Sequence, residues 1–134
     1  MRVVVDTNCL LASVPPKGNY YWFYEAFRTG KFEWLISNEI LTEYLEKLSY
    51  IFSDNTAFVV YSVLSTSPYV NFSEPFYKWQ LMHNDPDDNK FADMAVAGSA
   101  DYLITNDRHF DILRGIPFPK VNVVSLDDFR KIIG

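Results

Sequence analysis

The chain has 134 residues, of which 49% are hydrophobic, and these values are typical of one globular domain rather than of a disordered segment. Its 12 basic and 17 acidic side chains give a net charge of −5, which argues against broad binding to nucleic acid by bulk positive charge. No apolar stretch approaches the roughly 20 residues that span a bilayer, and the single cysteine, Cys9, cannot form an internal disulfide. We therefore expect one soluble, cytoplasmic domain over residues 1–134, with no membrane partner and with Cys9 as a small buried side chain.

Strands and helices alternate in the first half of the chain. Residues 2–5 form a β-branched run without polar interruption, which is typical of a central parallel strand buried on both faces. The other elements expected in this half are a helical turn at 10–13, a helix at 20–28, a strand at 33–36, a helix from a cap at Ser37 or Asn38 to about residue 49, a helix at 54–65 with Phe58, Val59, Tyr61, Val63 and Leu64 facing inward, and a strand at 69–72.

The second half begins with residues 74–84, which have no clear period and are predicted to form a loop. Residues 89–99 then predict a helix that is apolar on nearly every side and therefore lies buried against a sheet. The remaining expected elements are a strand at 102–105, a short helix around 110–114, a strand at 121–124, and a helix capped by Ser125 that runs to residue 133. The alternation predicts an α/β fold, a three-layer α/β/α sandwich with a mainly parallel five-stranded sheet.

Two acids follow predicted strands directly. Asp6 ends the run VVVDTN and Asp107 ends the run YLITND, so each strand finishes in an acid accompanied by threonine and asparagine. Either acid could simply cap the helical turn that follows it. Ligand sites in open α/β sheets lie beyond the carboxyl ends of the strands. If the two strands are neighbours, both carboxylates point into one crevice.

Further acids lie on the two central predicted helices. Asp88 opens the helix at 89–99, where it could serve as a cap, and a carboxylate at a helix N-terminus is already stabilised there. Glu43 lies at the edge of the apolar stripe of the helix after the second strand, so it can lean over the same sheet edge. Like charges about 4 Å apart repel by roughly 4 kcal/mol at an effective dielectric near 20. Converging carboxylates therefore predict a hard cation, Mg²⁺ or Mn²⁺.

The run VVVDTN, the acid after the second strand and the segment DPDDNKFADMAVAGSADYLITND together resemble the PIN-domain ribonuclease family, as found in VapC-type toxins of toxin–antitoxin systems. The resemblance implies a metal-dependent RNA endonuclease that hydrolyses phosphodiester bonds. It implies an acidic set that serves both as metal ligands and as catalytic groups: Asp6, Glu43, Asp88 and Asp107. It further implies that the groups orienting the acids or the attacking water are Thr7 or Asn8, together with Thr105.

Several assignments remain open at this level. Glu39 or Glu46 could replace Glu43, and the assignment of Asp88 within DPDD is uncertain by a residue or two, although Asp85 and Asp87 suit a solvated loop. Asp93 is expected at a polar rim or beside a basic side chain, and His83 and His109 lack zinc-ligand spacing and suit surface or cap roles. The basic candidates for gripping RNA phosphates are Lys78, Lys90 and Arg108.

The aromatic run at residues 20–27 permits two interpretations. It either forms a broad core contact or marks an interface, and the family resemblance suggests an antitoxin protein or a second copy in a homodimer as the partner. Two alternative functions also remain: a catalytically silent PIN-like module that binds protein or RNA, and a phosphatase of the haloacid dehalogenase type. The phosphatase chemistry requires a second aspartate two positions after the first, and this chain has Asn8 there.

Overall fold

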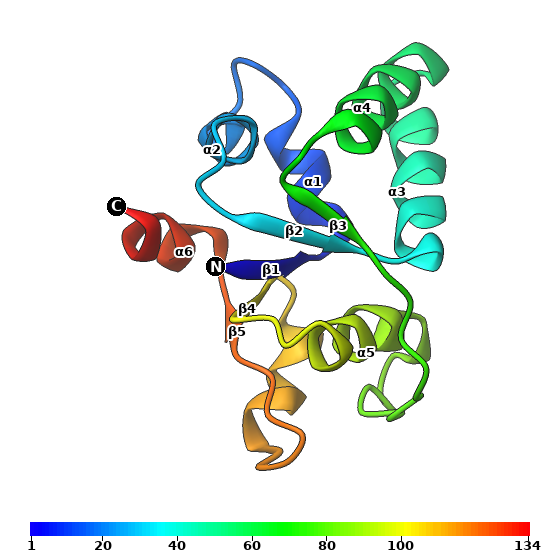
Figure 1. Ribbon diagram of the computed structural model, residues 1–134, viewed down its shortest axis with the longest axis vertical. Coiled ribbons are helices and arrows are strands. Elements are labelled where there is room, and N and C mark those ends of the chain that lie inside the picture. The colour runs from blue at the N-terminus through cyan, green and yellow to red at the C-terminus, as the bar shows by residue number, and fades with distance from the viewer.

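A five-stranded sheet forms the centre of the computed structural model, which describes residues 1–134 (Figure 1). The strands are β1 (Arg2–Val5), β2 (Glu33–Ile36), β3 (Val70–Phe72), β4 (Tyr102–Ile104) and β5 (Val123–Val124). They lie in the order β3-β2-β1-β4-β5, and all four neighbouring pairs are parallel. Strand β1 is therefore central, and β4 is its neighbour although almost a hundred residues separate them in the chain.

Helices cover both faces of this sheet. They are α1 (Thr7–Ser13), α2 (Tyr21–Arg28), α3 (Asn38–Ile51), α4 (Asp54–Thr66), α5 (Asn89–Ala97) and α6 (Leu126–Ile133), with 3₁₀ helices η1 (Pro86–Asp88) and η2 (Arg108–Gly115). Helices α1 to α4 lie on one side of the sheet, and α5 lies on the other (Figure 1). This arrangement confirms the predicted three-layer α/β/α fold. None of the helices combines the length and the apolar character needed to cross a bilayer.

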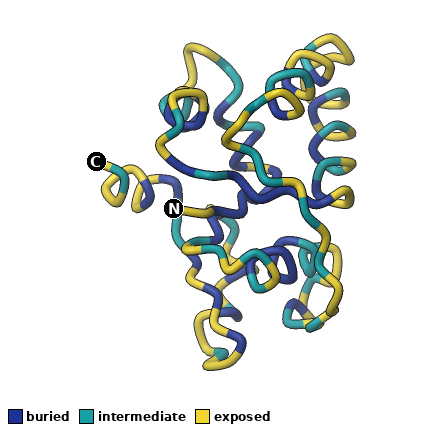
Figure 2. The backbone as a smooth tube through the Cα atoms, viewed as in Figure 1, coloured by how far each residue is buried: buried dark blue, intermediate teal, exposed yellow.

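The core extends through the central strands and the inner faces of the helices (Figure 2). The side chains of Val3, Val4 and Val5 are fully buried, as expected for a strand covered on both faces. The aromatic run in α2 contributes chiefly to this core, because Phe23 and Phe27 are also fully buried. Their rings pack with three further aromatic side chains, namely Phe32, Trp34 and Phe129. The structure thus favours a core contact for this run rather than an interface.

Helix α3 is attached to the central strand by a buried polar contact. The Tyr44 hydroxyl donates a hydrogen bond to the carbonyl of Val5 and accepts one from Trp34 Nε1 at 3.3 Å. Tyr44 is fully buried. Because Val5 directly precedes Asp6 and Tyr44 directly follows Glu43, this contact sets the position of two segments that carry acids.

The predicted inward face of α4 is wrong. Ala57, Val60 and Leu64 are buried, whereas Phe58 is 68% and Val59 50% exposed. The helix packs against α3 rather than against the sheet (Figure 1), so it buries only a narrow stripe of residues separated by three and four positions. Of the other residues predicted to face inward, Tyr61 is exposed and Val63 is partly buried, whereas Leu64 is fully buried as predicted.

Element boundaries shift by a few residues from their predicted positions. The turn expected at 10–13 is a helix that begins at Thr7, directly after Asp6. Helix α5 ends at Ala97, because Ser99 adopts a positive φ of 51° and the Ala100 N–H bonds back to the carbonyl of Ala95. The expected fifth strand at 121–124 shortens to Val123–Val124, since an edge strand has a hydrogen-bonding partner on one side only.

Candidate metal centre

Asp6 and Asp107 lie at the carboxyl ends of neighbouring strands, β1 and β4. The Asp6 side chain accepts a 2.9 Å hydrogen bond from the Thr105 hydroxyl, and Asp6 is only 5% exposed. The same hydroxyl accepts a 2.9 Å bond from the Asp107 N–H. One buried threonine therefore connects both strand ends and holds the two acidic segments against each other.

Asp107 has a second bond that limits its motion. Its carboxylate accepts from the backbone N–H of His109 at 2.9 Å and so caps η2. The predicted cap role is therefore real, but it occupies only one carboxylate oxygen. The other carboxylate oxygen accepts no hydrogen bond, so a side chain that is 34% exposed keeps a free acceptor.

Glu43 projects from α3 toward the same sheet edge. Its carboxylate accepts a hydrogen bond from the Thr7 hydroxyl and forms an ion pair with Lys90 Nζ at 2.9 Å. Thr7 is buried and belongs to the first turn of α1, next to Asp6. The alternatives Glu39 and Glu46 are exposed and line a neighbouring surface hollow with Glu43. Glu43 is thus the acid of this helix that contacts the strand end.

Asp88 lies at the junction between η1 and α5. It occupies the N-cap position of α5, but its side chain makes no capping hydrogen bond. Partial burial, followed by the charges of Asp85, Asp6 and Asp107, raises the pKa of Asp88 to about 7. The carboxylate therefore faces other carboxylates rather than the helix N-terminus.

The electrostatics of Asp6 show the same convergence. Burial raises the pKa of Asp6 to about 6, against the lowering effect of the Thr105 hydrogen bond, and the charges of Asp107 and Glu43 raise it further. A carboxyl group that is buried among like charges is stabilised when a cation is bound nearby. The acidic set consists only of carboxylate oxygens, which is the donor chemistry that Mg²⁺ and Mn²⁺ prefer. The residues present therefore fit a hard divalent ion.

Lys90 is the one cation paired with the acidic set. Its side chain is 9% exposed, its ammonium contacts Glu43 and the carbonyl of Asp87, and it lies 5.4 Å from the centre of the Phe91 ring. One positive charge offsets only part of the charge of the four acids. The expected role of Lys90 as a phosphate contact is thus replaced in this structure by an ion pair.

Two residues that the sequence reasoning set aside lie beside the acidic set. Ligand atoms of Asp85, Asp88 and His109 all lie within 4.8 Å of one another. His109 Nδ1 is 3.5 Å from Asp85 and 3.6 Å from Asp107. The sequence places His109 two residues after Asp107. A single histidine without a second ligand at zinc-ligand spacing does not by itself indicate a metal site. Asp85 was likewise assigned to a solvated loop, whereas it is only partly exposed.

The remaining candidates lie around this centre. Asn8 is exposed and lines a small cavity with Cys9 and Asp107. Burial raises the pKa of Cys9 to about 12, so its thiol stays protonated at neutral pH. Asp93 is buried in α5, where it accepts a 3.1 Å bond from the Trp79 N–H instead of pairing with a base. Asp87 is exposed.

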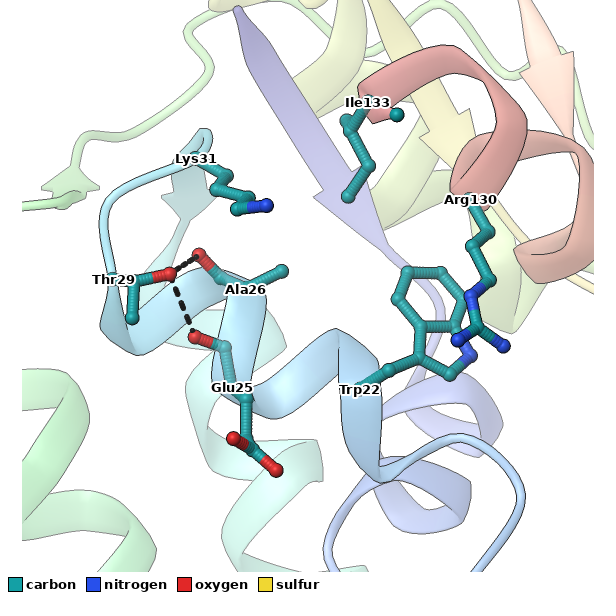
Figure 3. Close-up of a pocket in the computed structure, with 8 residues that line it drawn as sticks. Trp22, Glu25, Ala26, Thr29, Lys31, Arg130 and Ile133 are labelled. Carbon is teal, nitrogen blue, oxygen red and sulfur yellow. Dashed lines mark hydrogen bonds between the residues drawn. The ribbon is translucent and has the colours of Figure 1, made fainter.

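A separate hollow lies between α2 and α6 (Figure 3). Trp22 and Arg130 form one wall, with the guanidinium carbon 5.3 Å from the ring centre. Lys31 also lines it and precedes β2, which places the hollow at the amino-terminal edge of the sheet. It is therefore at the opposite edge from the acidic set.

Comparisons with known proteins bear on the family and the fold of the chain. The family model described as PIN domain matches residues 2–109, a range that includes the whole acidic set. No curated protein sequence matches the chain. The crystal structure of VapBC2 from Rickettsia felis bound to a DNA fragment from their promoter is similar, with 17% identity, a TM-score of 0.64, and coverage of 93% of this chain and 98% of that one.

A second similar structure is FitAcB from Neisseria gonorrhoeae, with 15% identity, a TM-score of 0.57, and coverage of 92% of this chain and 97% of that one. At such identities the two structures establish a shared fold, and the family match covers well over half of the chain. The chain belongs to the PIN domain family.

Proposed function

We propose that this chain is a metal-dependent endoribonuclease that hydrolyses RNA phosphodiester bonds, and that it is the toxin of a toxin–antitoxin pair. PIN domains are generally nucleases. The observation that carries the proposal is the convergence of Asp6 and Asp88 with Glu43 and Asp107, expressed in the raised pKa values of the first two. Such mutual repulsion is relieved when Mg²⁺ or Mn²⁺ binds.

Residues around the acidic set hold the acids in place. Thr105 positions Asp6, and Thr7 positions Glu43. Fixed acids lower the cost of ordering the site when substrate arrives. A bound Mg²⁺ or Mn²⁺ supplies activation of water and stabilisation of charge on the phosphate oxygens. A deprotonated carboxylate of the acidic set acts as the general base that accepts a proton from the attacking water.

Two alternatives are less well supported. A silent module would not need several carboxylates in mutual repulsion, because each unneutralised pair is costly. The phosphatase chemistry requires a second aspartate two positions after Asp6, and the exposed Asn8 of α1 occupies that position. The match to the PIN domain model does not favour a phosphatase either. The nuclease proposal uses all four acids.

Cleavage of a fluorescent single-stranded RNA tests the catalytic proposal. The purified chain should cleave the RNA with Mg²⁺ or Mn²⁺ and lose activity in EDTA. Asp6→Asn and Asp107→Asn should each reduce the rate at least 100-fold. Asp87→Asn, at an exposed acid in η1 directly before Asp88, is the matched control and should retain activity. Wild-type rates in both site variants would refute the metal-site proposal.

The partner proposal rests on an apolar surface on α3 and α4. Six large apolar residues of this helix pair are exposed: Tyr50, Ile51, Phe52, Phe58, Val59 and Tyr61. Contiguous exposed apolar surface on a soluble domain marks interaction sites. We assign this surface, rather than α2, to the antitoxin protein, and we retain the homodimer and the cytoplasmic location as proposals.

Copurification with the product of the adjacent gene tests the partner. The double variant Phe58→Ser/Val59→Ser should abolish the complex, whereas Tyr21→Ser on α2 should leave it intact. Light scattering of the chain alone and of the complex gives the number of copies. A mass of one copy for the chain alone, and of one copy plus the partner for the complex, would contradict the homodimer while leaving the partner proposal standing.

A further inference from the structure

Three aromatic side chains gather beside α5 outside the acidic set, and we call them the aromatic platform: Tyr77, Trp79 and Phe118. The ring centres of Tyr77 and Trp79 lie 4.6 Å apart, and those of Trp79 and Phe118 lie 6.0 Å apart in an edge-to-face arrangement. Tyr77 is 64% and Phe118 79% exposed. Both ring pairs are edge-to-face, and the exposed surface of Tyr77 and Phe118 is available for contact with a ligand.

The platform is held in place by the protein. The backbone N–H of Trp79 donates a 3.1 Å hydrogen bond to the buried carboxylate of Asp93. The next residue, Gln80, has a φ of 56°, a left-handed conformation that is uncommon for a glutamine. Met82 is fully buried, and its N–H donates to Asn89 at 2.8 Å. The loop at 74–84 is therefore tied to α5 at two points.

The same loop leads from the platform to the acidic set. Asn89, which holds Met82, directly follows Asp88. The Asn84 side chain donates to the carbonyl of His109 at 3.1 Å, two residues beyond Asp107. Trp79 and Asn84 are five residues apart, which is at most about 18 Å of chain. The platform is thus within a few nucleotides of the candidate metal centre.

The charges on the platform favour a nucleic acid over a protein. Lys78 lies between Tyr77 and Trp79 in the chain, and Lys120 follows Phe118 by two residues. Both lysines are exposed, in a chain whose net charge is −5. Lysine is depleted in the cores of protein interfaces, whereas aromatic rings interspersed with cations are the means by which proteins bind single strands.

We propose that the aromatic platform is a binding subsite for single-stranded RNA, in which unpaired bases stack on Tyr77, Trp79 and Phe118 and Lys78 and Lys120 contact the phosphates. The proposal rests on the endoribonuclease function proposed above and names the surface that would receive the strand. Every base has a flat face, so the subsite is tolerant of sequence. Paired bases cannot splay onto the rings, so duplex RNA is excluded.

Binding of a 5′-fluorescein-labelled mixed-sequence 12-nucleotide RNA, measured by anisotropy in EDTA so that cleavage is blocked, tests the subsite. Tyr77→Ala and Phe118→Ala should each raise the Kd between about 5-fold and about 150-fold, the range that corresponds to the loss of one stacked base. Tyr77→Phe should restore binding. Tyr69→Ala, at an exposed aromatic just before β3, is the matched control and should change the Kd less than about 2-fold.

Unchanged RNA affinity in Tyr77→Ala and Phe118→Ala would overturn the subsite, even if wild-type protein cleaves RNA as proposed. Loss of single-strand binding in these variants, together with no cleavage by any protein in Mg²⁺ or Mn²⁺, would support the subsite and refute the endoribonuclease. Loss of antitoxin binding with unchanged RNA affinity would assign the platform to a protein and refute the subsite. Equal weakening of a 12-base-pair duplex would also count against it.

Discussion

The Thr105 hydroxyl donates to the Asp6 carboxylate at 2.9 Å across two neighbouring strands, from a residue 99 positions later in the chain. The contact is buried, and it opposes the effect of burial on the Asp6 pKa. The hydroxyl of the residue that follows β4 thus favours the ionised form of the acid that follows β1.

Thr105→Val should weaken metal binding while keeping the shape of the site. Loss of a hydrogen bond to a charged group costs about 1.5–3 kcal/mol, and the pKa of Asp6 should rise further. Calorimetric titration with Mn²⁺ at pH 6.5 should show at least a 10-fold weaker affinity than wild type. Thr66→Val removes an exposed hydroxyl that bonds only within α4, and equal affinities in all three proteins would contradict the assigned role.

The stability of the metal-free protein should fall as pH rises from about 4 to about 6. Folding raises the pKa of Asp6 from 3.8 to about 6, so in this window the folded state keeps a proton that the unfolded state has lost. The lost stability is roughly 3 kcal/mol, at 1.36 kcal/mol per pKa unit. Asn at position 6 does not titrate, so the Asp6→Asn variant lacks this loss. In urea unfolding, the free energy of unfolding of the variant should therefore increase relative to that of wild type between pH 4.5 and 7. A pH-independent difference would rule this out.

Lys90→Gln should make the fold more dependent on a divalent ion. Without Lys90, the 25%-exposed Glu43 side chain keeps only the Thr7 bond, and the uncompensated acidic set should cost about 1–3 kcal/mol in EDTA. Mn²⁺ should then raise the melting temperature of Lys90→Gln by more than that of wild type. Lys47→Gln, in the same surface hollow, provides the comparison, and an identical Mn²⁺ effect in all three would argue against the charge balance.

His109→Ala should lower affinity for ions that accept nitrogen ligands and leave Mg²⁺ binding nearly unchanged. The imidazole lies with Asp85 and Asp88 in a group whose ligand atoms are within 4.8 Å. Imidazole suits Zn²⁺ and Ni²⁺, whereas Mg²⁺ prefers oxygen. Titration should show a drop of at least 10-fold for Zn²⁺ and little change for Mg²⁺. His83→Ala serves as control, and a parallel loss of both ions would mean that His109 only supports the local fold.

Tyr44→Phe should destabilise the protein by about 1–3 kcal/mol, because it leaves the Val5 carbonyl and the Trp34 N–H unpaired in the core. Chemical denaturation is the appropriate measurement. Tyr50→Phe, at a position that is 85% exposed, should change stability by less than about 0.5 kcal/mol. If both variants unfold at the same denaturant concentration, the buried contact contributes nothing.

Local patterns in the sequence were sufficient for the central strand and for the order of elements. The run VVV predicts a strand buried on both faces, and Asp6 follows it as expected. The inward face of α4 was not predictable in this way, because Phe58 and Val60 are both apolar and only the position of α3 decides which is buried.

The candidate site was predictable where an acid follows a strand and less so elsewhere. Asp85 and His109 are brought beside Asp88 by the loop and η2, which have no periodic signal. The aromatic platform combines residues from two loops about 40 positions apart, so no local pattern could indicate it. These features depend on contacts between distant segments, for which a single sequence gives no direct evidence.

The parallel pairing of β1 with β4 also has a consequence for synthesis of the chain. Asp6 emerges first, but its hydrogen-bonding partner and Asp107 follow only after about a hundred more residues have been added. Until β4 has docked beside β1, a nascent chain holds at most three members of the acidic set and has no assembled centre. The proposed nuclease centre is therefore complete only after this late strand has folded into place.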